Sequence, residues 1–337
     1  MANSIALAKT FVPLLDEVYK TASVTSVLDG SPELVRMGAN VNELTIPKLS
    51  MQGLGSYSRN GGYVSGDVTL THETVQCNFD RGRMFSVDAL DDDETAGIAF
   101  GRLAGEFIRT KVGPELDAFR FACYAGAPGI SKAASGAALS SGEDAVAAIR
   151  AGQNALDEDE VPLEDRYLFI TPPILGYIQD METTKSREVL DGFAGIVRVP
   201  QTRFYTGIVQ YDGSTEGQEA GGYAKAPAVY AKTSDLAIDS DKTYYTLAGG
   251  VYSAVAEPVL ADIGSYYEQT GAAGLDINFM IVHKSAVIQY QKHVAPKIID
   301  PGTNQSADAW KFGYRTVGVA DVYENKTAGI YLHHKAS

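Results

Sequence analysis

Apolar residues are interspersed with polar ones along two strand-like stretches of the chain, residues 41–49 and 68–79, which flank a glycine-rich segment. The segment between them, from Gly53 to Gly62, contains the glycine and asparagine residues that tolerate the positive φ of tight reversals. A two-stranded ribbon of about forty residues is only marginally stable alone in water. The pattern therefore predicts an extended hairpin that lies on another surface, in a protein that works by contacting copies of itself.

The return strand of this hairpin changes its buried face partway along. Val68 and Leu70 lie on one face, whereas the later apolar residues Val75, Cys77 and Phe79 lie on the other. A one-residue change of phase moves every following side chain to the opposite face of a strand. We therefore expect a β-bulge or a strong twist in this strand.

A long helix is predicted after the hairpin. Four acidic residues at 91–94 stand at its start, where the helix dipole favours negative charge. Arg109 and Arg120 are expected on its polar faces, and Pro114 must bend or restart it because proline lacks a backbone N–H. The apolar stripe recurs mostly at steps of three and four residues and consists of Phe100, Leu103, Phe107, Val112, Leu116, Phe119 and Cys123.

Shorter elements alternate over the rest of the chain and indicate an α+β fold. Residues 1–35 are predicted as an arm with one short amphipathic helix. Ser140 and Glu143 form a capping box for a helix over 142–157. Other short helices are expected over 174–181 and 284–290, strands over 166–171, 195–200, 277–282, 310–314 and 329–333, and an extended piece over 296–301.

The composition changes between Ala224 and Thr270. Paired tyrosines occur at 244–245 and at 266–267, with Gly249 and Gly250 between the two pairs. Short strands rich in tyrosine and threonine, separated by glycine turns, are typical of a small β-sheet. We therefore expect a small β module inserted into the surrounding domain.

Composition and charge narrow the class of protein. The chain has 337 residues, of which 45% are hydrophobic and 21% charged, as in an ordinary globular protein. A net charge of −14 argues against direct nucleic-acid binding, which relies on clustered Lys and Arg. No apolar run approaches the roughly 18 residues of a membrane span. Cys77 and Cys123 are too few for a disulfide framework and fit a reducing cytoplasm.

We find no pattern that predicts a catalytic, cofactor or metal site. The histidines at 72, 283, 293, 333 and 334 lack the spacing of zinc ligands, and the last two are expected in a solvated C-terminal tail. Cys77 lies an odd number of residues from His72, which places the two on opposite strand faces. The glycine-rich segments 53–62 and 217–222 lack the Lys-Ser/Thr of a phosphate loop. Acidic runs at 91–94 and 157–160 fit helix ends and solvated loops better than a cation site.

Four stretches carry a resemblance to one family. They are KVGPELDAFR at 111–120, NFMIVHKSAVIQYQKHVAPK at 278–297, DAWKFGYR at 308–315 and GIYLH at 329–333. In this order, and combined with an arm, an extended loop and a long helix, they resemble the major capsid proteins of tailed bacteriophages, which have the Hong Kong 97-like fold. The resemblance covers nearly all of the chain except residues 224–270.

The resemblance implies a plan of domains and a function. Residues 1–40 would form an N-terminal arm, 41–85 an extended loop across a neighbouring subunit, and 86–140 a peripheral domain with the spine helix. Residues 141–299 would form an axial domain carrying the 224–270 insertion, and 300–337 the closing peripheral strands. The implied protein is a non-enzymatic shell subunit that forms pentamers and hexamers and encloses double-stranded DNA without reading its sequence. Its implied location is the virion, after assembly in the bacterial cytoplasm.

Two features depart from some members of the family. Only residues 1–40 precede the loop, so we expect a separate scaffolding protein, besides a portal, optional decoration proteins and no membrane. The loop tip carries Arg59 and its flank only Lys48, so no covalent cross-link is expected. Two other classes stay open: another virion component such as a tail-tube or adhesion protein, and a soluble α+β enzyme using His283 or His293.

Overall fold

A computed structural model describes residues 23–30, 36–37, 43–60, 62–89, 104–133, 136–181, 183–234, 237–239 and 242–336. The chain divides into two compact units, Met1–Thr110 with Val287–Tyr323, and Lys111–Ala286 with Glu324–Ser337. Most of the predicted N-terminal arm and the acidic start of the long helix at 91–94 lie outside the described residues. The described elements mix helices and strands, which confirms the predicted α+β class.

The first unit contains a three-stranded antiparallel sheet in the order β15–β16–β4. Phe107 packs against one face of this sheet. Its ring centroid lies 4.8 Å from that of Phe85, 6.4 Å from that of Phe312 and 6.2 Å from that of Tyr314. The predicted aromatic strand over 310–314 is thus confirmed as part of a longer one. The strands are β4, Phe79–Asp88, β15, Val287–Ile299, and β16, Ala309–Val322.

The predicted helix over 284–290 is wrong beyond its first turn. A 3-10 turn, Lys284–Ala286, is followed at once by β15. Val287 pairs with Val322 and Tyr290 with Val319. Pairing with a long neighbouring strand therefore overrides the local preference of these residues.

The segment before the hairpin is fastened to β15 at Gln289, whose carbonyl also accepts from the Gly30 N–H at 3.2 Å. The 3-10 helix η1, Val24–Leu28, buries Leu28. Gln289 Nε2 donates to the Thr25 carbonyl at 2.8 Å and to Asp29 Oδ1 at 2.6 Å. Because Gln289 is itself buried, these bonds stand in for the water that its amide loses.

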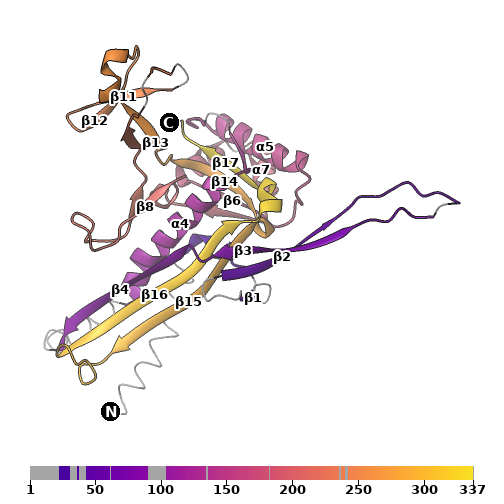
Figure 1. The fold of residues 1–337 in the computed structure, drawn as a ribbon. Coiled ribbons are helices and arrows are strands. Elements are labelled where there is room, and N and C mark those ends of the chain that lie inside the picture. The colour runs from indigo at the N-terminus through magenta and orange to yellow at the C-terminus, as the bar shows by residue number, and fades with distance from the viewer. Residues whose placement is uncertain are drawn as a thin grey trace. The chain divides into compact units, whose positions relative to one another are not determined.

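The predicted hairpin is present as a long arm, drawn in indigo in Figure 1. Its strands are β2, Glu43–Met51, and β3, Val68–Gln76, with the short β1, Arg36–Met37, beside β2. The β2–β3 register runs from Glu43↔Gln76 to Met51↔Val68 without a shift. The expected bulge is therefore absent from this pairing. The change of phase arises because Val68 and Leu70 lie on the exposed face of β3, whereas Val75 lies on the buried face.

The long helix changes type near its proline. The backbone is helical from 104 to 126, with a π-helical stretch at Ile108–Val112 and α4 at Gly113–Gly126. Pro114 stands in the first turn of α4, where a missing N–H costs little. The predicted restart at this proline is confirmed.

The π-helical stretch also shifts the buried face of α4. Phe121 and Tyr124 are fully buried, whereas Phe119 and Cys123 of the predicted stripe are only partly buried. Arg120, expected on a polar face, is 2% exposed. A π turn accommodates one extra residue, so side chains after it point about 100° away from a 3.6-residue repeat.

The second unit is built on a five-stranded mixed sheet in the order β5–β17–β14–β6–β7. Central strand β14 is buried along its whole length, as its continuous apolar run predicts. The strands are β5, Ser131–Lys132, β6, Arg166–Ile170, β7, Gly195–Arg198, β14, Ile277–His283, and β17, Ile330–His334.

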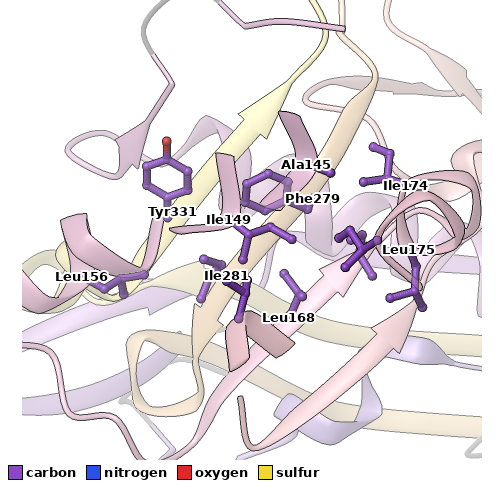
Figure 2. Close-up of a cluster of buried hydrophobic side chains, with 12 residues drawn as sticks. Ala145, Ile149, Leu156, Leu168, Ile174, Leu175, Phe279, Ile281 and Tyr331 are labelled. Carbon is purple, nitrogen blue, oxygen red and sulfur yellow. The ribbon is translucent and has the colours of Figure 1, made fainter. Parts of the chain in front are cut away.

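Helices cover one face of this sheet and form the core shown in Figure 2. Ile149 of α5 and Leu175 of α6 pack on Phe279 and Ile281 of β14. On the opposite face, Phe121 of α4 contacts Phe169 and Phe204, with ring centroids 5.3 Å and 4.7 Å apart. The covering helices are α5, Gly142–Glu158, α6, Pro172–Asp180, and α7, Thr184–Asp191.

The capping box of α5 lies one residue beyond the predicted one. Ser141 is the N-cap, and its Oγ accepts a bond from the Asp144 N–H at 3.1 Å. The same hydroxyl donates to Asp144 Oδ2 at 2.7 Å. The prediction from Ser140 and Glu143 is therefore wrong by one position, since either serine supplies a capping oxygen.

The tyrosine-rich residues form a separate four-stranded sheet in the order β10–β13–β11–β12. Tyr244 and Tyr266 are buried on one side, and their hydroxyls accept backbone bonds from Asp239 and Val259 at 3.1 Å and 3.0 Å. The elements are β10, Val229–Lys232, β11, Tyr244–Ala248, β12, Val251–Ala254, η5, Leu260–Ser265, and β13, Tyr267–Gly271.

A narrow neck joins this sheet to the rest of its unit. Ala226 donates to the Gly207 carbonyl at 3.0 Å, and Gly274 donates to the Ala226 carbonyl at 2.9 Å. A Cβ at position 274 would lie 2.2 Å from the Gly207 oxygen, so the close backbone approach requires glycine. The neck is flanked by β8, Ile208–Gln210, and β9, Tyr223–Lys225. The unit also contains the 3-10 helices η4, Gln201–Arg203, and η7, Glu324–Gly329.

Candidate functional site

The outer part of the arm exposes apolar side chains. Leu70 is 60% exposed and Val68 68% exposed, although both lie on a β-strand. Contiguous exposed apolar surface on a folded chain marks a site of interaction with another molecule. The exposed apolar residues of the arm are Met51, Leu54, Tyr57, Tyr63, Val64, Val68 and Leu70.

The end of the arm is ordered by its own contacts. Ser58 and Gly62 exchange backbone bonds of 3.2 Å and 2.8 Å. The rings of Tyr57 and Tyr63 lie beside this bridge with centroids 4.9 Å apart. Tyrosines held in this way offer large rigid contact area and lose little conformational entropy when they bind.

Electrostatics place little cost on burying the arm. Between residues 50 and 71 the sequence contains two charged side chains, Arg59 and Asp67. A surface with few charges loses little solvation free energy when another surface covers it. The arm is therefore suited to burial against a partner and not to steering by charge.

The root of the arm is fixed to the sheet of its own unit. Val75 is 6% exposed and packs with Ile288 and Val319. Asn78 Nδ2 donates to the Ala320 carbonyl at 2.8 Å, and the Ala320 N–H donates to Asn78 Oδ1 at 3.1 Å. Sequence reasoning missed Asn78, although an asparagine between two strands of opposite phase is a usable signal.

An ion pair lies on β4 and β16 next to this root. Arg315 Nε and Nη2 donate to the two carboxylate oxygens of Asp80 at 2.9 Å and 2.6 Å. These bonds lower the pKa of Asp80 below its usual value. Both side chains are largely exposed, so we assign the pair a small effect on stability.

Of the histidines considered for chemistry, His283 is in structural surroundings. His283 is buried at the end of β14, and its Nδ1 lies 2.9 Å from the Ser285 hydroxyl. Burial lowers the pKa of His283. His293 is exposed on β15, and His72 is exposed on the arm. Within the described residues, no three His, Cys, Asp or Glu side chains come together as a metal site requires.

The expectation that His333 is solvated is wrong. His333 is 5% exposed on β17, its ring is stacked on Phe279 at 5.1 Å, and its Nδ1 lies 3.0 Å from Asn278 Nδ2. Burial lowers the pKa of His333 to about 4. The physical reason is that β17 lies between β14 and β5 and is not a tail. The adjacent His334 is partly exposed, and its Nδ1 contacts the Lys335 carbonyl at 2.7 Å.

The cysteines and the acidic run at 157–160 are also in structural surroundings. Cys77 and Cys123 are both partly buried and unbridged, and burial raises the pKa of the Cys77 thiol. Asp157 pairs with the buried Arg166 at 2.7 Å, and Arg166 also donates to the Val161 and Pro162 carbonyls. The run at 157–160 thus helps to fold the loop between α5 and β6.

The glycine-rich segments serve as turns where they are described. Gly62, Gly217 and Gly222 all have positive φ.

None of the described helices is both long and apolar enough to cross a membrane.

Comparison with known proteins identifies the fold. No protein-family model matches the sequence, and no curated protein matches it at a significant level. Among solved structures, the capsid of cyanophage P-SCSP1u matches with a TM-score of 0.50 and 12% identity, over 90% of this chain and 86% of that chain. The mature capsid of bacteriophage PhiM1 matches with a TM-score of 0.50 and 12% identity, over 87% and 82%. The chain therefore has the Hong Kong 97-like fold of phage capsid proteins, as the resemblance led us to expect.

Proposed function

We propose that this chain is a major capsid protein that assembles into the icosahedral head shell of a tailed phage. The proposal is carried by the outer part of the arm, which exposes apolar side chains and has two charged residues between positions 50 and 71, on a chain with a phage capsid-protein fold. An arm of this kind gains stability when it lies on a second copy, because its apolar surface then leaves water. Many such contacts of modest strength add up in a closed shell.

We further propose the domain plan that the resemblance implies. Residues 41–85 act as the extended loop, 86–140 and 300–337 as the peripheral domain, and 141–299 as the axial domain with its 224–270 insertion. The arm-like course of β2 and β3 supports the first assignment, and the separate sheet of β10 to β13 supports the insertion. Residues 1–40 act as an N-terminal arm.

The proposed partners follow from enclosure of a genome. Copies of this chain form pentamers and hexamers around double-stranded DNA, with a separate scaffolding protein and a portal, and with decoration proteins as optional additions. The net charge of −14 favours a wall that does not adhere to the DNA it surrounds. The proposed location is the virion, after assembly in the host cytoplasm, and we assign the chain no enzymatic role.

Electron microscopy of the purified protein, with and without a co-expressed scaffolding protein, tests this function. The expected products are closed shells, or rings of five and six subunits. Stacked tubes would instead support a tail component. A protein that stays monomeric at every concentration and with every scaffold would contradict the proposal. Replacing His283 or His293 with alanine tests the alternative that the chain is an enzyme. We expect no enzymatic activity to be lost in either variant.

A further inference from the structure

The chain leaves one sheet and enters another at two residues, Cys77 and Asn78. Before them, β3 is paired with β2 in the arm; after them, β4 is paired with β16. The last β4–β16 pair is Phe79 with Gly318. Whatever holds residues 77 and 78 therefore sets the direction in which the arm leaves the sheet.

The side chain of Asn78 continues the β16 ladder after the main chain has left it. Its amide donates to the Ala320 carbonyl at 2.8 Å and accepts from the Ala320 N–H at 3.1 Å. A carboxamide has the same donor and acceptor as a peptide group, so it can replace one strand residue. Aspartate keeps the acceptor and loses the donor, and alanine loses both.

A second contact prevents rotation about this point. Val75, three residues back along the arm, packs with Ile288 of β15 and Val319 of β16. One polar contact at Ala320 and one apolar contact at Val319 thus hold the root on successive residues of the same strand. Side chains fixed by packing and by hydrogen bonds keep a surface in its binding geometry.

From these contacts we propose that Asn78 is a positioning residue that fixes the direction of the arm. The consequence for assembly rests on the proposed function: an arm held in one direction docks without first losing orientational freedom. Loss of Asn78 leaves the subunit folded, since the three-stranded sheet below it keeps all its own pairs. The arm then samples a wider range of directions.

Electron-electron distance measurements between two spin labels test the positioning directly. The labels are placed at Ser65→Cys on the arm and Ser86→Cys on β4, both exposed, in a chain whose Cys77 and Cys123 are replaced by serine. The expected distance distribution is narrow with Asn78 present. It should become at least about twofold wider in Asn78→Ala and in Asn78→Asp at pH 7.5, because neither variant can donate to Ala320.

The matched control is Asn304→Ala in the same unit. Asn304 also makes a side-chain amide bond to a backbone carbonyl, at 2.8 Å to Ala309, but far along the chain from the arm root. Its removal should leave the distribution narrow. A narrow distribution in Asn78→Ala would overturn the inference. A narrow one in Asn78→Asp would also overturn it, since the donor would then be unnecessary.

Shell yield separates this inference from the proposed function. Asn78→Ala should raise the protein concentration needed for assembly about tenfold, whereas Asn304→Ala should not change it. Broad distances with normal assembly would keep the positioning role and contradict the assembly role of the arm. If the unsubstituted chain fails to assemble, only the proposed function is contradicted. The spin-label distances would still test whether Asn78 fixes the direction of the arm.

Discussion

The arm and the tyrosine-rich sheet are both β-structures without a large aliphatic core. They differ in whether their large side chains are buried or exposed. The sheet of β10 to β13 buries Tyr244 completely and satisfies its hydroxyl with a backbone bond. The arm leaves Leu70 and Tyr63 in water, at 60% and 90% exposure. This difference fits the proposed function, in which the sheet is complete within one chain and the arm is completed by a second copy.

The sheet also organises its second face from its own residues. Tyr230 stacks on Tyr252 with centroids 4.1 Å apart, and Tyr252 meets Tyr267 at 5.2 Å. Aromatic pairs of this kind add about 0.5 to 1.5 kcal/mol each beyond burial of their area. The arm has one such pair, Tyr57 with Tyr63, and no layer of the described chain covers it.

Removal of the arm tip should have the largest effect on assembly. Deleting residues 53–62 shortens the hairpin and leaves every β2–β3 pair, from Glu43↔Gln76 to Met51↔Val68, outside the deletion. We expect a folded subunit whose melting temperature shifts by no more than about 2 °C, with shell formation abolished. Light scattering and electron microscopy measure the assembly. Shells of normal yield would show that the tip is not an intersubunit element.

A tyrosine-to-alanine substitution in each region sharpens the comparison. Tyr244→Ala should cost about 3 to 5 kcal/mol within the tyrosine-rich sheet, whereas Tyr63→Ala on the exposed arm should cost about 0.5 kcal/mol or less in the free subunit. Amide hydrogen exchange of the two regions reports local stability. Equal loss of protection in both variants would mean that the arm is stabilised within its own chain.

Acid should destabilise the sheet of the second unit and leave the arm root in place. The pKa of His333 is about 4 in the folded chain, against about 6.5 when unfolded. The unfolded chain therefore binds more protons between these values, so stability is complete above about pH 6.5 and falls as the pH drops toward 4. The loss is roughly 3 kcal/mol at most.

The histidine variants check this assignment by urea unfolding at several pH values. His333→Gln should flatten the slope of stability between pH 4 and 6.5. The burial-lowered pKa of His283 acts in the same direction, so part of the slope remains. His72→Gln, on the exposed arm, is the matched control. An unchanged slope in His333→Gln would place the acid sensitivity elsewhere.

Removal of the tyrosine-rich sheet should have the smallest effect on assembly. The Gly274 N–H already donates to the Ala226 carbonyl at the neck, as in a β-turn, so a two-residue Gly-Gly turn between them can replace residues 227–273 and keep this bond beside β8 and β9. We expect shells at a yield within about twofold of the full chain. Failed assembly, with a folded subunit by circular dichroism, would make the sheet an intersubunit element.

The sequence predicts elements that depend on local pattern. The apolar run of β14, the alternation around Phe312 and the restart at Pro114 all follow from periodicity or from proline geometry, and all are present. The hairpin follows from its glycine-rich reversal. The fold as a whole was predicted from the family resemblance, and the matches to solved capsid structures over most of the chain support it.

The misses depend on residues distant in sequence. Residues 287–290 form a strand because β16 lies beside them, and His333 is buried because β17 has a strand on each side. Asn78 bonds to a residue 242 positions away. The phase shift of α4 comes from a π turn that a uniform helical repeat does not include. Local propensity contains none of this information.

Photocrosslinking from the arm tests the central claim most directly. Tyr63 is replaced by a benzophenone-bearing phenylalanine, and Tyr252 of the tyrosine-rich sheet carries the same group as a control. In assembled particles we predict covalent dimers from position 63, with the linked peptides in a second copy, and few from position 252. Crosslinks from position 63 that stay within a single chain in assembled particles would contradict the account.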